Sequence, residues 1–151
     1  MPNALSHRLR SARCSQPGRR YVLTATTHCR TPLFSDLNSA RLIVEQLRQC
    51  DREGASRTLA WVVMPDHVQW LVELGEVTLA RLMRRFKSRS SLMLRKAGVR
   101  HYPVWQAGYH DRALSSEDSV LRVARHIVAN PVRAGLVERV GHYPHWDAVW
   151  L

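Results

Sequence analysis

The feature that most constrains the fold is a pair of apolar runs on either side of Met64-Pro65-Asp66. Proline and aspartate favour turns, so the runs predict two antiparallel strands joined by a short connection. Side chains alternate along a strand, which places His67 and Gln69 on one face. The other face is apolar and must pack into a core, because it carries Val68, Trp70 and Val72.

The polar face of this strand offers an imidazole and a carboxamide side by side. Both groups can present a lone pair to a cation, so His67 and Gln69 are candidate metal ligands. The alternative is a solvent-facing strand on which the two residues have no joint role. Their spacing alone leaves both interpretations open.

Turn and cap signals predict a strand and a helix before this hairpin. The β-branched run 21–27 fits a first strand. Ser35 is the expected N-cap of a helix, because apolar residues then recur at helical spacing. These residues are Leu37, Ala40, Ile43, Val44 and Leu47.

The same signals predict two helices and a strand after the hairpin. Thr78 is expected to cap a helix that ends at Gly98, and residues 104–112 are expected to form a strand bent at Gly108. Ser115 or Ser116 is expected to cap a last helix, with Glu117 and Asp118 in its first turn. This helix should stop near Asn130-Pro131, because proline disfavours a helical residue before it.

The order strand–helix–strand–strand–helix–strand–helix contains the split βαβ pattern of a ferredoxin-like domain. We therefore predict an α+β fold, with an antiparallel sheet and helices packed on one face. Residues 1–20 are rich in Arg, Ser and Pro and are expected to form a basic flexible arm. Residues 21–151 are expected to form the single domain.

The charge balance points to a nucleic-acid partner. The chain has 23 Lys and Arg against 12 Asp and Glu, a formal charge of +11. An inert basic surface or binding to anionic lipid would fit the same balance. Cys14, Cys29 and Cys50 form no CxxC pair, and no apolar run reaches the ~20 residues of a membrane span, so we expect a cytoplasmic protein.

Two groups of polar residues could contact DNA. The second helix carries basic residues and no acidic one, namely Arg81, Arg84, Arg85, Lys87, Arg89, Arg95 and Lys96. We interpret this side as a phosphate-contacting face, although a solvated face is the usual alternative. On the last helix, Ser119, Arg122, His126 and Asn130 recur at spacings of three and four and form a polar stripe.

Several segments together resemble the REP-associated tyrosine transposases, which belong to the single-tyrosine HUH transposase superfamily. The similar segments are 60–67, 104–106, 110–114 and 128–137, in that order, with 143–150 closing the chain. The resemblance implies a metal-dependent single-strand DNA endonuclease. It also implies guidance by hairpins formed from repetitive extragenic palindromes, and association with the nucleoid.

In the family's reaction, two histidines of one strand hold Mg²⁺ or Mn²⁺, which polarises a phosphodiester. A tyrosine of the last helix attacks phosphorus and becomes joined to the 5′ end of the cut strand. The free 3′ hydroxyl can later reverse the attack. By position, this resemblance makes His67, Gln69 and Asn130 the metal ligands, although Asn130 could instead only end the helix.

The sequence departs from the family pattern at two positions. Gln69 replaces the second histidine, a mild change because a carboxamide oxygen suits a hard cation. His126 occupies the position of the nucleophilic tyrosine, and an imidazole does not readily replace a phenolate. Tyr109 is the alternative nucleophile, while His110 and Asp111 match a family motif and could assist catalysis or bind DNA.

Three functions remain open on this evidence. The chain could be a transposase-type nuclease with altered active-site groups, or a DNA-hairpin-binding protein that has lost catalysis. RNA hairpin binding is a third and weaker hypothesis. In each case the expected state is a monomer or a homodimer.

Overall fold

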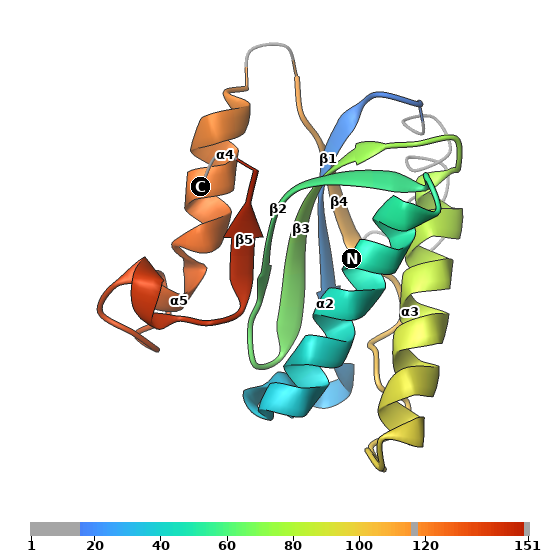
Figure 1. The fold of residues 1–151 in the computed structure, drawn as a ribbon, viewed down its shortest axis with the longest axis vertical. Coiled ribbons are helices and arrows are strands. Elements are labelled where there is room, and N and C mark those ends of the chain that lie inside the picture. The colour runs from blue at the N-terminus through green and yellow to red at the C-terminus, as the bar shows by residue number, and fades with distance from the viewer. Residues whose placement is uncertain (1–15, 116–117, 150–151) are drawn as a thin grey trace.

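The computed structural model describes residues 16–115 and 118–149, which form a five-stranded antiparallel sheet with helices on both faces (Figure 1). The strand order is β4-β1-β3-β2-β5. The strands are β1 (Arg20–Thr26), β2 (Ser56–Val63), β3 (His67–Leu74), β4 (His110–Ala113) and β5 (Trp146–Ala148). The α-helices are α2 (Leu37–Arg52), α3 (Leu79–Lys96), α4 (Val120–Val128) and α5 (Asn130–Arg133). The short 3₁₀ helices are η1 (His28–Arg30), η2 (Leu33–Ser35) and η3 (Val140–His142).

The first four strands and the helices between them confirm the predicted α+β class. Their chain order is β1-α2-β2-β3-α3-β4, and their order in the sheet is β4-β1-β3-β2, as in a ferredoxin-like domain. The predicted hairpin is confirmed as β2 and β3, and Val63 pairs with Val68 next to the turn.

The two faces of the sheet pack against different helices. The α2/α3 face, which carries Leu23 and Trp70, packs against both long helices, and the core there includes Ile43 and Phe86. Side chains alternate along β3, so His67, Gln69 and Leu71 all point to the opposite face, here called the α4 face. Helix α4 packs on it through Ala124, Ile127 and Val128. Figure 1 shows α2 and α3 on one side of the sheet and α4 on the other.

Two helix starts lie away from the predicted caps. Ser35 ends η2, and Asp36 is the N-cap of α2, because its carboxylate accepts a hydrogen bond from the Ser39 amide at 2.9 Å. Thr78 caps α3 as predicted. Ser119, not Ser115, caps α4 by accepting from the Arg122 amide at 3.2 Å, while Ser116 and Glu117 lie outside the described residues.

Asp118 was expected in the first turn of the last helix, and that prediction is wrong. The residue precedes the Ser119 cap, and its carboxylate accepts a hydrogen bond from the Ser115 amide at 2.7 Å. Its other oxygen accepts from Arg112 at 2.9 Å. Asp118 therefore closes the turn before α4.

The strand predicted over 104–112 is shorter than expected. Only His110–Ala113 forms β4, because Gly108 turns the chain with a φ of 78° and leaves Trp105 in a single bridge to Thr27. Strand β5, which pairs with β2, was not predicted. Strand β1 begins at Arg20, one residue before the predicted start of the first strand, and residues 1–15 of the expected arm lie outside the described part.

A helix that spans a membrane must be both long and apolar. None of the helices in the described part of the chain combines these two properties.

Candidate functional site

The turn between β2 and β3 is tied to the end of β1. The Met64 amide donates to the His67 carbonyl at 2.8 Å and closes the turn. The Thr27 amide donates to the Asp66 carbonyl at 2.9 Å, and Thr27 itself is fully buried. These contacts fix the backbone on both sides of Asp66, so the first residue of β3 has a defined position.

Asp66 orients the imidazole of His67. One carboxylate oxygen lies 2.7 Å from His67 Nδ1, and the other accepts from Arg30 Nε at 3.2 Å. Burial alone would raise the pKa of Asp66, yet the hydrogen bonds from His67 and Arg30 hold that pKa below its ordinary value. An ionised carboxylate on Nδ1 favours the tautomer with the proton there, so Nε2 keeps its lone pair for a ligand.

Gln69 meets Asn130 across the gap between the sheet and the last helices. The Asn130 side-chain amide donates to Gln69 Oε1, and Asn130 Oδ1 accepts from Arg133 Nη2 at 2.9 Å. Asn130 lies just after α4, as the first residue of α5. Two predicted metal ligands that lie far apart in the sequence are thus in direct contact.

His126 lies on α4 four residues before Asn130. Residue 129 is a turn residue between the two helices, so His126 lies in the last turn of α4 and Asn130 is the first residue of α5. The His126 side chain is exposed, whereas neighbouring Ile127 is buried on the α4 face of the sheet. A side chain at position 126 is therefore accessible to solvent, on the helix that directly precedes Asn130.

The donor set fits a hard divalent cation. His67 offers a ring nitrogen, and Gln69 and Asn130 offer carboxamide oxygens, which suit Mg²⁺ or Mn²⁺. Among the described residues no group of three His, Cys, Asp or Glu side chains is placed to hold a metal. A site here would therefore depend on the two amide oxygens beside the imidazole, and a cation would have to share or displace the hydrogen bonds that they accept from Asn130 Nδ2 and Arg133 Nη2.

The tyrosines lie in different surroundings. Tyr109, the alternative nucleophile, packs against the core of the α2/α3 face, across the sheet from His67 and Gln69. Tyr21 is fully buried in the same core. Tyr143 donates its hydroxyl to the Val63 carbonyl at 2.6 Å, and burial raises its pKa to about 12. These placements favour structural roles for all three.

His110 shares a row of the sheet with Gln69. It pairs with Thr24, which pairs on its other side with Gln69, so all three point to the α4 face. Two strand spacings separate His110 from Gln69 by about 10 Å. Asp111 pairs with Leu23 and points to the opposite face.

The basic side of α3 is partly engaged within the protein. Arg85 and Arg89 both pair with Glu53, the Arg85 contact measuring 3.1 Å. Lys87 Nζ donates to the carbonyls of Gln106, at 2.8 Å, and Gly108, and burial lowers its pKa to about 8. Arg81 and Arg84 are exposed.

Arg122 lies in the first turn of α4 and is also exposed. It belongs to the same helix as His126 and therefore to the layer that covers the His67 side of the sheet. It is nearer in sequence to Asn130 than any of the basic residues of α3.

Two residues of the site were missed by sequence reasoning. Asp66 was read only as a turn residue, although an acidic residue directly before a histidine can hold its ring. Arg133 follows Asn130 by three residues, a spacing that brings side chains together on a helix. Both signals were present in the sequence.

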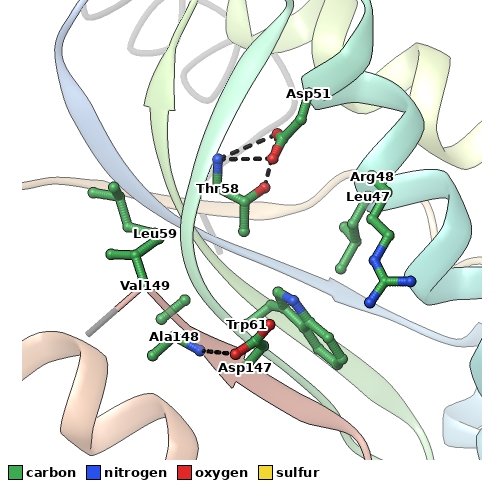
Figure 2. Close-up of a pocket in the computed structure, with 10 residues that line it drawn as sticks. Leu47, Arg48, Asp51, Thr58, Leu59, Trp61, Asp147, Ala148 and Val149 are labelled. Atoms are coloured by element: carbon green, nitrogen blue, oxygen red, sulfur yellow. Dashed lines mark hydrogen bonds between the residues drawn. The ribbon is translucent and has the colours of Figure 1, made fainter. Parts of the chain in front are cut away.

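A separate hollow of about 220 Å³ lies between α2 and the β2–β5 edge (Figure 2). The Asp51 carboxylate in its lining already has partners within the protein, since it accepts hydrogen bonds from the Thr58 hydroxyl at 2.8 Å and the Thr58 amide at 3.1 Å. Neither His67 nor Asn130 lines this hollow, so it is distinct from the site described above.

Comparison with known protein families gives one match. Residues 16–130 match the family described as "Transposase IS200 like", a range that includes His67, Gln69, His126 and Asn130. No curated protein matches.

Two solved structures share the fold. One is a REP-associated tyrosine transposase bound to a REP hairpin, with 19% identity and a TM-score of 0.73 over 87% of this chain and 78% of that one. The other is a putative transposase from Deinococcus radiodurans R1, with 21% identity and a TM-score of 0.56 over 72% of this chain and 87% of that one.

Proposed function

This chain belongs to the IS200-like transposase family, and on that basis we propose that it is a transposase-like protein that binds single-stranded DNA hairpins. We further propose a divalent-metal site at His67, Gln69 and Asn130, with strand cleavage and transfer weakened by the absence of a tyrosine at position 126. The observation that carries the proposal is the contact between Gln69 and Asn130 beside an imidazole oriented by Asp66.

Each residue of the proposed site would have a separate role at a bound phosphodiester. Mg²⁺ or Mn²⁺ would polarise a phosphate oxygen and favour attack at phosphorus. Asp66 would keep the Nδ1 proton on His67 and leave Nε2 available, while Arg133, which donates to Asn130, would place a positive charge near the bound phosphate. The site thus has the means to bind and polarise the phosphate.

The nucleophile is the weak part of this site. At position 126 an imidazole would have to form a phosphorus–nitrogen bond, which gives a phosphoramidate in place of the stable phosphotyrosine link. Tyr109 packs on the other side of the sheet. We therefore propose that DNA binding is retained and that covalent strand transfer is slow.

A second candidate is a DNA-hairpin-binding protein with no catalysis. His126 favours it, because a binding protein does not need the tyrosine. Incubation with labelled palindromic single strands and Mn²⁺, followed by denaturing electrophoresis, separates the two. Cut strands with a protein-linked 5′ end support the nuclease, whereas binding without cut product supports the second candidate, and no binding to any hairpin contradicts both.

Asp66→Asn is expected to weaken Mn²⁺ affinity by about 10- to 100-fold, because a carboxylate that orients a ligating histidine contributes on that scale. The measurement is the loss of the free Mn²⁺ electron paramagnetic resonance signal on titration. Asp147→Asn is the matched control, since Asp147 is an exposed residue of β5. Equal affinities for both variants would contradict the orienting role.

Arg122→Ala is expected to lower the slope of log affinity against log salt by about 1, as loss of one phosphate contact does. Arg52→Ala serves as control, because that guanidinium on α2 already contacts Glu45 and Gln49. Affinity for a palindromic strand is measured over a salt series. An unchanged slope for Arg122→Ala would shift the phosphate contacts to Arg81 and Arg84 on α3.

A further inference from the structure

The end of the sheet that carries His67 also carries an exposed group of rings and cations. Tyr102 is the most exposed of the large apolar side chains in the described part of the chain, at 73%. The Arg95 guanidinium lies 5.3 Å from the centre of its ring. One face of the ring is thus covered by a cation, and the high exposure leaves the opposite face open to a planar ligand.

A second pair of rings lies directly beside Tyr102 in the chain. The His101 and His28 rings are 6.0 Å apart and tilted by 43°. His101 Nε2 lies 3.2 Å from the His28 carbonyl oxygen. The His28 amide donates to the Val104 carbonyl at 2.9 Å, so η1 and the segment 101–104 are joined.

The buried side of this segment is anchored to α3. Trp105 is 6% exposed, and its ring nitrogen donates to the Ser90 hydroxyl at 3.0 Å. The rings before it are therefore presented from a fixed backbone, which lowers the entropy lost when a ligand stacks on them.

The rings lie next to the candidate metal site. Thr26 pairs with His67, Thr27 donates its amide to the Asp66 carbonyl, and His28 is the next residue. Thr27 also bridges to Trp105 on the other side. The rings therefore lie at the same end of the sheet as the candidate metal site, although the His67 side chain points to the α4 face and Trp105 packs on the α2/α3 face.

The positive charge of residues 95–105 favours binding of a polyanion. Residues 95–105 contain Arg95, Lys96 and Arg100 and no acidic residue. The nearby Asp66 carboxylate is already bound by Arg30 and His67. Rings interleaved with cations are the arrangement that binds single-stranded nucleic acid by stacking bases and neutralising phosphates.

We infer that Tyr102, with Arg95, His101 and His28, forms a stacking platform for unpaired nucleobases of the DNA strand that flanks the hairpin. This inference rests on the proposed function, because it assigns a place to the unpaired part of the same substrate. It adds a binding site outside the metal ligands, at the C-terminal end of α3, where Arg95 is the one platform residue that belongs to the basic side of that helix.

The test compares fluorescence anisotropy titrations of a blunt hairpin, the same hairpin with a short unpaired tail, and one whose tail carries abasic sugars. The natural protein should bind the tailed hairpin about tenfold more tightly than the abasic one, because stacking needs bases and not only phosphates. Tyr102→Leu should remove that difference and leave the affinity for the blunt hairpin unchanged. Tyr102→Trp, which keeps an aromatic face, should preserve the difference.

The outcomes separate this inference from the proposed function. Binding to the blunt hairpin with equal affinities for the normal and abasic tails overturns the stacking platform and leaves the proposed function standing. A tail effect that survives Tyr102→Leu also overturns the platform at this place. If the protein binds none of the three hairpins, both the stacking platform and the proposed function are overturned. The abasic comparison needs no variant, so it decides the matter even if a substitution at position 102 disturbs folding.

Discussion

His126→Tyr is expected to raise the initial rate of covalent protein–DNA adduct formation by at least about tenfold, which corresponds to about 1.4 kcal/mol of activation free energy. The new phenolate oxygen would bond to phosphorus as the bond from phosphorus to the 3′ oxygen breaks, and that oxygen would leave with a proton as a free 3′ hydroxyl. Position 126 is exposed and four residues before Asn130, while the apolar contacts of α4 through Ala124 and Ile127 stay unchanged. Denaturing electrophoresis of a labelled hairpin with Mn²⁺ measures the adduct.

His126→Phe is the matched control, because it supplies the same ring without the attacking oxygen. It should form no adduct and bind hairpins as the tyrosine variant does. Gln69→His can be added to strengthen the metal site. If the double variant still leaves every hairpin uncut with either metal, the loss of activity lies beyond these two residues. An adduct in the natural protein that disappears on Tyr109→Phe would contradict the assignment of position 126.

The parts of the fold that local patterns determine were predicted from the sequence. The alternation around Met64-Pro65-Asp66 identified both the hairpin and the face that carries His67 and Gln69, because strand periodicity needs only neighbouring residues. The helices followed from apolar spacing in the same way. The contact between Gln69 and Asn130 could not be predicted from local patterns, because 61 residues separate them; only the family resemblance placed the two residues together.

The features that sequence reasoning missed depend on competition between nearby groups or on distant pairing. Both Ser35 and Asp36 are good N-caps, and only the 3₁₀ turn of η2 decides in favour of the aspartate. Strand β5 has three residues, too few for a periodic signal, and forms because β2 offers a free edge. The internal partners of Arg85, Lys87 and Arg89 likewise come from segments far away in the sequence.

Trp105→Ala is expected to lower the free energy of unfolding by about 3–5 kcal/mol, a large part of the ~5–15 kcal/mol typical of a domain. The Trp105 ring packs 5.5 Å from both Phe34 and Phe86, and it also links β1 to α3. Its removal leaves a cavity at the centre of the α2/α3 core. Equilibrium unfolding in urea measures the change.

Trp105→Phe separates packing from hydrogen bonding, because it keeps an aromatic ring and loses the donor to Ser90. The lost hydrogen bond is worth about 0.5–1.5 kcal/mol, so this variant should lie much nearer the natural protein than the alanine variant. A loss below about 1 kcal/mol for Trp105→Ala would contradict a central role for the ring. Because the same backbone carries His101 and Tyr102, Trp105→Ala should also weaken binding of a tailed hairpin more than that of a blunt one, measured at a temperature at which the alanine variant is folded. Such a result would indicate that the packing of Trp105 helps to position His101 and Tyr102 for binding the unpaired tail.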